Sequence, residues 1–283
     1  MKRIVLFLAV LSLATFACAV QLTDTPTPPP TDAPVVTDAP VVTDPPVVTE
    51  PPVVTEPPGP ITNASCANVL FYLDPSLGTS ILCETIPASS EMMDTHPQYT
   101  KVTLQGYPLA DKFFEPIIAV YPVSDYIALM PDHIPNRVAE LQNLIGGGAP
   151  TQTSYPFLPV FNAGQAFNLN GGLLSFNNGS GIRFLTEYAQ YYAPVNNNDL
   201  FYTFQGLTAD GFSWISVIMP INHSTLPANA DNPPPGYTWE QLSTNYDAYV
   251  TAVISQLEAQ PPASFSPSMD ALDALVNSIQ VTP

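Results

Sequence analysis

The sequence predicts an α+β domain in which helices cover an antiparallel β-sheet. Apolar and aromatic runs separated by Gly, Asn and Asp clusters fill residues 164–221, a pattern typical of a meander of antiparallel strands. Shorter strand-like runs precede this meander, and three segments with helical periodicity lie before and after it. This order of elements favours a sheet with helices on one or both faces. The earlier runs are residues 69–73, 79–82, 99–104 and 116–122.

The clearest hairpin of the meander lies at its end. Strand-like residues 200–206 and 212–221 are joined through a short segment that contains Asp210 and Gly211. An Asp-Gly pair can supply the positive φ angle that a tight reversal requires. We therefore expect a tight turn at these two residues and pairing of the strands on either side.

Two cysteines flank an expected hairpin near the start of the domain. Residues 69–73 and 79–82 have the composition of strands, and the Pro- and Gly-containing residues 74–78 predict the turn between them. If these strands pair, Cys66 and Cys83 face each other near the open end of the hairpin. In an exported chain such a pair favours a disulfide over metal ligation. Closing a loop of about 18 residues contributes about 3 kcal/mol in the chain-entropy model.

The first expected helix follows these strands. Apolar residues recur on one face of residues 134–145, and Pro135 lies in the first turn, where proline is tolerated. Asp132 or His133 is placed to cap the helix. The triple glycine at residues 146–148 follows the helix instead of preceding it, so it predicts a helix end and not a phosphate-binding loop.

Two further helices are expected near the end of the chain. Thr238 and Gln241 form a capping-box pattern at the start of an amphipathic segment that continues to about residue 257. The prolines at residues 261–262 end it. A last short helix follows the Ser-Pro pair at residues 266–267 and carries apolar residues at helical spacing.

Composition excludes several classes of partner. The chain has 283 residues, and 46% apolar residues with 14 Phe and 13 Tyr are enough for a substantial core. The net charge is −18, and removal of Lys2 and Arg3 with a signal peptide would leave four cations against 24 acids, a net charge of −20. This balance repels phosphate backbones and anionic lipid head groups. We expect no nucleic-acid partner and no membrane contact through basic residues.

The first residues predict export. Two basic residues precede an apolar run, residues 4–16, which is too short to span a bilayer and is typical of a secretory signal peptide. The run leads to Cys18, which would be the lipidated first residue of a bacterial lipoprotein. An A-x-A pattern also fits cleavage after Ala19. We favour the lipid anchor, with residues 1–17 as signal peptide, because a thiol followed by a long stalk is otherwise hard to explain.

Residues 18–60 predict this stalk. A six-residue repeat of Thr, an acid, Ala or Pro, Pro and two Val recurs from residue 31. Proline fixes φ and removes hydrogen-bond donors, so the segment is expected to be disordered. In the polyproline II conformation about forty residues would reach on the order of 120 Å. Residues 61–283 then form a single globular domain.

The signal, the cysteine at residue 18 and the Pro/Thr stalk resemble those of bacterial surface lipoproteins. The resemblance implies a domain held at the cell surface through a lipid on Cys18. The order of exported anchor, proline stalk and aromatic antiparallel sheet with covering helices is similar in outline to the Mog1/PsbP-like lipoproteins. This similarity concerns architecture and extends to no site residue.

Few residues suit catalysis. The chain has three His, and none of the local motifs of serine hydrolases, zinc peptidases, EF-hands, P-loops or dinucleotide-binding folds occurs in it. The candidates for acid–base catalysis are Asp132 with the adjacent His133, and His223 after the last strand of the meander. Neighbouring carboxylate and imidazole residues are also frequent without any such role, since catalytic partners meet in space and not in sequence.

Polar and aromatic residues of the meander are the candidates for ligand binding. Arg183, in the middle of a strand, either pairs with a structural carboxylate, for which Glu187 falls on the same strand face, or binds an anionic ligand. Asn197 and Asp199 belong to an Asn-rich loop that, with nearby aromatic residues, would suit a sugar-stacking or Ca²⁺ surface. These aromatic residues are Tyr191, Tyr192, Trp214 and Trp239. Loops of this composition are also ordinary turns between strands. No other cofactor is evident.

The stalk and the lack of a catalytic motif favour a surface binding or assembly module for an extracellular or cell-wall ligand. The alternative is a cell-envelope hydrolase that uses Asp, Glu or His in a cleft beside the meander. A deep pocket with converging carboxylates would favour the hydrolase, and a shallow aromatic face would favour binding.

Overall fold

The computed structural model describes residues 62–91 and 94–282, which belong to one compact unit. The predicted signal peptide and stalk lie outside these residues, and so does the predicted lipidation site at Cys18. In the part of the chain that is described, no helix is long and apolar enough to cross a membrane.

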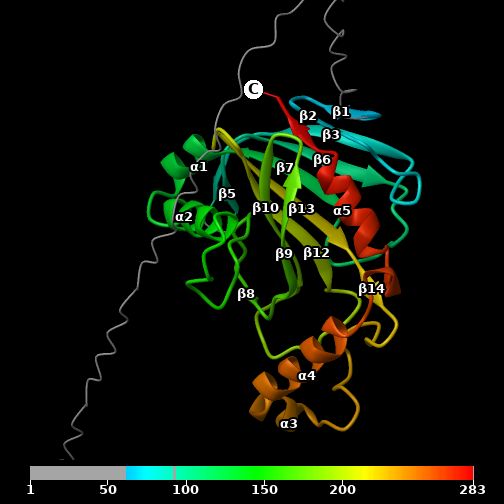
Figure 1. The fold of residues 1–283 in the computed structure, drawn as a ribbon. Coiled ribbons are helices and arrows are strands. Elements are labelled where there is room, and N and C mark those ends of the chain that lie inside the picture. The colour runs from blue at the N-terminus through cyan, green and yellow to red at the C-terminus, as the bar shows by residue number, and fades with distance from the viewer. Residues whose placement is uncertain (1–61, 92–93, 283) are drawn as a thin grey trace, which may run out of the picture. The chain divides into compact units, whose positions relative to one another are not determined.

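The domain is α+β and is built on a seven-stranded sheet in which all neighbouring strands are antiparallel (Figure 1). The strand order is β3-β6-β7-β13-β12-β10-β9, so the last strand of the meander pairs with an earlier strand, β7. The strands are β3 (Ser80–Ile86), β6 (Tyr99–Gln105), β7 (Ile117–Pro122), β9 (Leu169–Phe176), β10 (Gly179–Thr186), β12 (Phe201–Thr208) and β13 (Ser213–Pro220).

The predicted meander is confirmed, with one departure. Strands β9, β10, β12 and β13 follow one another in the sheet, and Gly211 has a φ of +76° in the tight turn between β12 and β13. The departure is a separate two-stranded sheet of β8 (Gly164–Gln165) and β11 (Tyr188–Ala189). The chain therefore leaves the main sheet between β10 and β12, and this excursion builds the site described below.

Successive side chains of a strand point to opposite faces of the sheet, and those of the central strands are apolar on both faces. Each face therefore needs a cover, and each forms a buried core. Tyr202 and Phe204 belong to the core under α4 (Tyr246–Glu258) and α5 (Met269–Asn277). Phe201 and Leu207 belong to a second core. Two further helices, α1 (Val123–Leu129) and α2 (Ile134–Ile145), cover that opposite face. Figure 1 shows α2 and α5 on opposite sides of the sheet.

The predicted pairing of residues 69–73 with residues 79–82 is wrong. Strand β2 (Val69–Phe71) lies between β1 (Ala64–Cys66) and β16 (Gln280–Val281), whereas β3 pairs with β6 over seven residues. The longer register with β6 satisfies more backbone groups than a three-residue hairpin would. The disulfide between Cys66 and Cys83 is nevertheless confirmed, with 5.4 Å between the Cα atoms. It links β1 to β3 across two different sheets.

The predicted helices are present with three differences. Helix α2 begins after His133, as predicted, but no side chain caps it through a hydrogen bond. The segment opened by Thr238 is divided at Asn245 into α3 (Trp239–Thr244) and α4, and both hydrogen bonds of the capping box between Thr238 and Gln241 are formed. Helix α1 was not predicted, because seven residues are too few to show helical periodicity. Helix α5 is capped by the Ser268 hydroxyl, which accepts from the Ala271 N–H. The remaining short elements are β4 (Ser89–Glu91), β5 (Asp94–His96), β14 (Asn222–His223), β15 (Phe265–Ser266) and the 3-10 turn η1 (Pro262–Ser264).

Candidate functional site

The candidate site is a pocket of about 510 Å³ beside the small sheet of β8 and β11. Three segments that are distant in sequence line it: the loop before β7, the loop before β8, and β11 with the residues that follow it. Five of its lining side chains are aromatic, and we call it the aromatic pocket. These side chains are Phe113, Phe114, Phe161, Tyr188 and Tyr191, and the polar side chains beside them are Asn162, Gln190 and Asp199.

The inner wall of the aromatic pocket is a preformed stack of rings. Phe114 contacts both Phe161 and Phe201, with ring centroids 5.3 Å and 4.5 Å apart. Tyr188 lies 5.3 Å from Phe161 and 5.0 Å from Phe157. These contacts join the pocket wall to the buried core of the sheet. The wall is therefore held in place before any ligand binds.

The rim of the aromatic pocket exposes two large rings to solvent. Phe113 is 66% exposed and Tyr191 is 65% exposed, although aromatic side chains of this size are normally mostly buried. The Phe113 N–H donates to the Asn198 carbonyl at 3.1 Å, so the loop that carries this ring is tied to the Asn-rich loop. The neighbouring Lys112 Nζ donates to the Asn197 carbonyl at 2.8 Å.

Asp199 brings a carboxylate to the pocket. Its two oxygens accept from the side-chain amides of Asn196 and Asn198, each at 2.8 Å. Lys112 lies close enough for the Asp199 charge to raise its pKa, although burial lowers that pKa by more. Asp199 is thus held by neutral amides and keeps acceptor capacity toward the pocket.

Asn197 is part of the predicted site but is used structurally. Its side-chain oxygen accepts from the His223 N–H at 2.8 Å, and its amide donates to the carbonyls of His223 and Leu226 at 3.1 Å each. These bonds fix the loop after β13 to the Asn-rich loop. Asn197 therefore shapes the site without offering its side chain to a ligand.

Glu187 is a buried acid that directly precedes the pocket residue Tyr188. The residue is 1% exposed. Its Oε2 accepts from the Asn196 N–H at 3.3 Å, and its Oε1 has no hydrogen-bond partner among the described residues. Burial raises its pKa well above the ordinary value, and the nearby Asp199 charge adds to the increase. Burial also raises the pKa of Tyr188 to about 12, so this hydroxyl stays protonated. The sequence signal for Glu187 was an acid within the aromatic meander, but its burial could not be predicted from the sequence.

Arg183 lies outside the aromatic pocket, and its predicted partner is wrong. Its Nε is 3.3 Å from Oδ2 of Asp273 on α5, and Nη1 donates to the Asn170 carbonyl. Strand β10 ends at Thr186, so Glu187 does not continue the strand face that carries Arg183. Arg183 does have a structural carboxylate partner, but it is Asp273, on a helix that packs on the sheet.

Trp214 does not belong to a sugar-stacking surface. It is 1% exposed, and its indole N–H donates to Oε1 of Gln205 at 2.8 Å. The same oxygen accepts from the Leu158 N–H at 3.0 Å. Trp214 therefore helps to seat the loop before β8 on the sheet. Alternation along a strand cannot tell which face of a two-sided sheet is covered by such a loop.

His223 is buried in a structural hydrogen-bond arrangement. Nδ1 lies 2.8 Å from the Thr225 hydroxyl and 3.4 Å from the Thr225 N–H, which assigns Nδ1 as acceptor and places the proton on Nε2. Nε2 lies 3.2 Å from the Ser264 hydroxyl, whose own proton goes to the Pro261 carbonyl at 2.7 Å. His223 is thus a donor to Ser264 and not its base. Burial also lowers the pKa of His223.

His133 and Asp132 are exposed at the start of α2, away from the aromatic pocket. His133 lines a small polar cavity, and the Asp132 carbonyl accepts from the Asn136 amide at 3.2 Å. Neither residue joins a nucleophile–base pair among the described residues. Of the sequence-predicted site residues, the structure therefore brings Tyr191 and Asp199 into the aromatic pocket. No group of three or more His, Cys, Asp or Glu in residues 62–91 and 94–282 is arranged to hold a metal ion.

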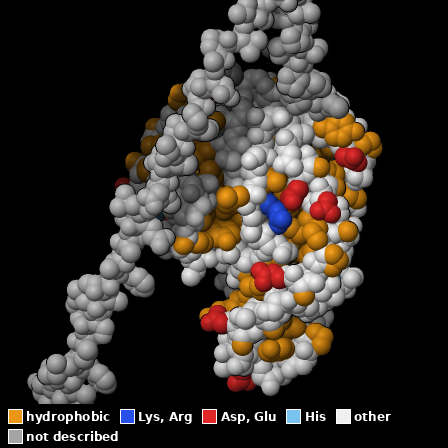
Figure 2. All heavy atoms as spheres, in the orientation of Figure 1, with side chains coloured by type: hydrophobic (Ala, Val, Ile, Leu, Met, Phe, Trp, Pro, Cys, Tyr) orange, Lys and Arg blue, Asp and Glu red, His pale blue; other side chains and the backbone are white. Residues whose placement is uncertain are grey.

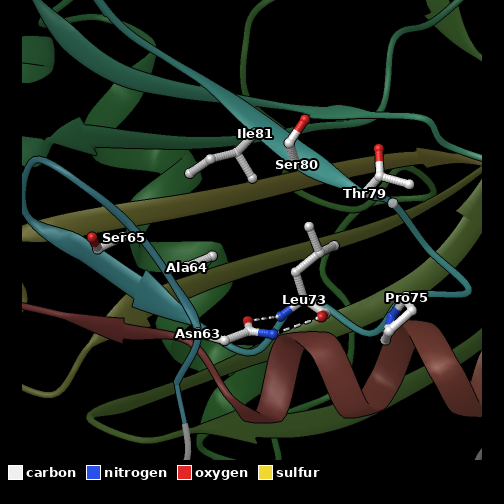
Figure 3. A pocket seen from close by; sticks show the side chains of 9 residues that line it. Asn63, Ala64, Ser65, Leu73, Pro75, Thr79, Ser80 and Ile81 are labelled. Carbon is white, nitrogen blue, oxygen red and sulfur yellow. Dashed lines mark hydrogen bonds between the residues drawn. The ribbon is translucent and has the colours of Figure 1, made fainter.

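A groove lined by other residues is chemically unlike the aromatic pocket. The groove, of about 710 Å³, lies between β1 and β3, and Figure 3 shows the Leu73 side chain among those that line it. The Asn63 side chain holds both backbone groups of Leu73, accepting from its N–H at 2.7 Å and donating to its carbonyl at 3.0 Å (Figure 3). None of the groove's nine lining residues is charged or aromatic. The groove is therefore a weaker candidate than the aromatic pocket.

Phe113 is the rim residue that the sequence did not point to, whereas Tyr191 was among the predicted aromatic residues. They are distant in sequence, and only the fold brings them to one rim. Comparison of the chain with protein-family models, with curated proteins and with solved structures found no match.

Proposed function

We propose that this protein is an exported binding module that holds an extracellular ligand in the aromatic pocket. The signal-like start, the cysteine at residue 18 and the proline-rich repeat support display of the domain on a lipid-anchored stalk. The observation that carries the proposal is the exposed pair Phe113 and Tyr191 at the rim of a preformed aromatic wall.

The ligand class that fits best is a neutral glycan. Flat ring faces beside a few amide and carboxylate groups suit a sugar, which has an apolar face and a rim of hydroxyls. Asn162, Gln190 and Asp199 supply these polar groups. The net charge of −18 disfavours anionic polymers, and Figure 2 shows basic side chains confined to a small area of the face it presents.

A glycan array probed with the full chain tests the proposal. We expect retention on neutral oligosaccharides such as chitotetraose or cellotetraose and none on polyanionic glycans. The double variant Phe113→Ser, Tyr191→Ser should lose retention, because it removes the two exposed rings without touching the core. The matched control is Phe212→Ser, an equally exposed ring that lies outside the pocket. Retention on no glycan, or retention that survives the double variant, would exclude this site.

A cell-envelope hydrolase is the second candidate, and Glu187 is the observation that favours it. A buried acid with a raised pKa beside a second carboxylate, here Asp199, is a common mark of acid–base catalysis. Glu187 does not line the aromatic pocket, which is why binding is preferred. Under the hydrolase alternative the full chain would release new reducing ends from a bound glycan, and Glu187→Gln would stop this release.

A further inference from the structure

A second cavity, of about 190 Å³, lies beside α2 and is chemically unlike the aromatic pocket. We call it the α2 cavity. Hydrogen-bond donors from two segments line it: His133 and Arg137 from the start of α2, and Gln152 and Ser154 from the loop that joins α2 to β8. The cavity is smaller than a typical pocket for a drug-sized ligand, which is at least about 300 Å³. It therefore suits a small molecule or one group of a larger one.

Arg137 is the charged centre of the α2 cavity. Lys101 and Arg183 each form an ion pair with an acid, at 3.2 Å and 3.3 Å. Within the described ranges, Arg137 forms no ion pair, and its guanidinium donates one long hydrogen bond, from Nη1 to the Phe157 carbonyl at 3.4 Å. In a chain with 24 acids and six cations, a half-buried guanidinium without an acid partner is unusual.

The one acid in the α2 cavity is not available to Arg137. Glu140 is buried, and its Oε1 and Oε2 accept from the Thr151 N–H at 2.8 Å and the Thr151 hydroxyl at 2.5 Å. These two hydrogen bonds hold the loop that joins α2 to β8 against the helix. Both oxygens of Glu140 are thus occupied by Thr151. The guanidinium N–H groups of Arg137 other than the one on Nη1 that donates to Phe157 have no protein partner among the described residues.

We propose that the α2 cavity binds a carboxylate group. A guanidinium offers two parallel N–H groups that match a carboxylate, and the Gln152 amide and the Ser154 hydroxyl lie in the same cavity as further donors. One cation neutralises one negative charge. A dianion such as phosphate would retain excess charge beside Glu140 in a strongly acidic protein, so a monoanion is the better fit. The carboxylate comes from a free small acid or from the end of a peptide.

Nuclear magnetic resonance of the ¹⁵N-labelled full chain tests this directly, because the sequence has three arginines: Arg3, Arg137 and Arg183. Acetate added at constant ionic strength should shift the Nε–Hε signal of Arg137 and the amides of Gln152 and Ser154. The Arg183 signal serves as internal control, since its Nε is already paired with Asp273. Equal movement of both arginine signals, or no movement of Arg137, would overturn the proposal.

Variants and matched ligands sharpen the test. Arg137→Gln should weaken acetate binding by at least about tenfold, whereas Lys101→Gln, which removes the same charge from an exposed pair, should not. If Arg137→Gln fails to fold, Arg137→Lys is the alternative variant. It keeps the charge but lacks the two parallel N–H groups of the guanidinium, so it should still weaken acetate binding. N-acetyl-alanine should bind and its amide should not, and tighter binding of an N-acetylated dipeptide than of acetate would identify a peptide end. Phosphate bound as tightly as acetate would contradict the monoanion assignment.

Discussion

At the scale of the residue, burial separates the two acids near the aromatic pocket, Asp199 and Glu187, by whether each can reach a ligand. Asp199 reaches the pocket and is held by two amides, whereas Glu187, twelve positions earlier in the chain, is enclosed with one oxygen unpartnered. Both residues were predicted to lie in the meander, and Glu187 was one expected partner of Arg183, the other being an anionic ligand. Strand β10 ends at Thr186, and Glu187 beyond it is buried and accepts from the Asn196 N–H, which the alternation of a strand does not predict.

Glu187 should make the stability of the protein depend on pH. Its native pKa is raised, so the folded state favours the protonated acid, and the resulting stability is present at low pH and is lost as pH rises toward the native pKa. Each pH unit between the ordinary and native pKa values costs about 1.4 kcal/mol. Urea unfolding at about pH 5 and about pH 8 should show wild type losing stability relative to Glu187→Gln. Parallel pH profiles for the two proteins would contradict the assignment.

Arg183 should contribute to stability and not to ligand binding. Asp273 has Arg183 and the Tyr202 hydroxyl as partners, yet burial still raises its pKa. Arg183→Gln leaves a half-buried acid without its cation, which should lower the free energy of unfolding by about 1–3 kcal/mol. Chemical denaturation measures this, and Arg183→Gln combined with Asp273→Asn should recover part of the loss. A double variant as unstable as the sum of the single variants would show that the two residues do not interact.

At the scale of the element, local signals predicted turns and helix ends better than strand partners. The Asp-Gly turn, the capping box and the proline stops act over a few residues, and the structure has each of them. The partner of β3 depends on which distant strand offers the longer register, and here β6 competes successfully with β2. The disulfide was nevertheless predictable, because the proposed export favours oxidised cysteines and a domain with two cysteines has one pairing available.

The disulfide should stabilise the domain by linking two sheets. Cys66 belongs to the small sheet of β1, β2 and β16, and Cys83 belongs to the edge strand of the main sheet. Changing both residues to Ser should lower the free energy of unfolding by about 3 kcal/mol, since the unfolded chain regains the freedom of the closed loop. Thermal and urea unfolding with and without reductant measure this. A stability unchanged by reduction would show that the link adds nothing to the packing of β1 on β3.

At the scale of the whole molecule, charge and architecture limit what the protein can bind. An acidic chain with few cations disfavours nucleic acids and anionic surfaces, and this expectation rests on composition alone. The position of a binding site did not follow from composition. The aromatic pocket needs the loop before β7, the loop before β8 and strand β11 to converge, and no sequence pattern joins these three segments.

The most direct test of the account is calorimetric titration of the full chain with a neutral oligosaccharide that the array identifies. Wild type and Phe212→Ser should bind with equal affinity, and Phe113→Ser combined with Tyr191→Ser should bind at least about tenfold more weakly, a loss of about 1.4 kcal/mol. Equal affinity of all three proteins, with unchanged thermal unfolding, would contradict the assignment of the aromatic pocket as the binding site.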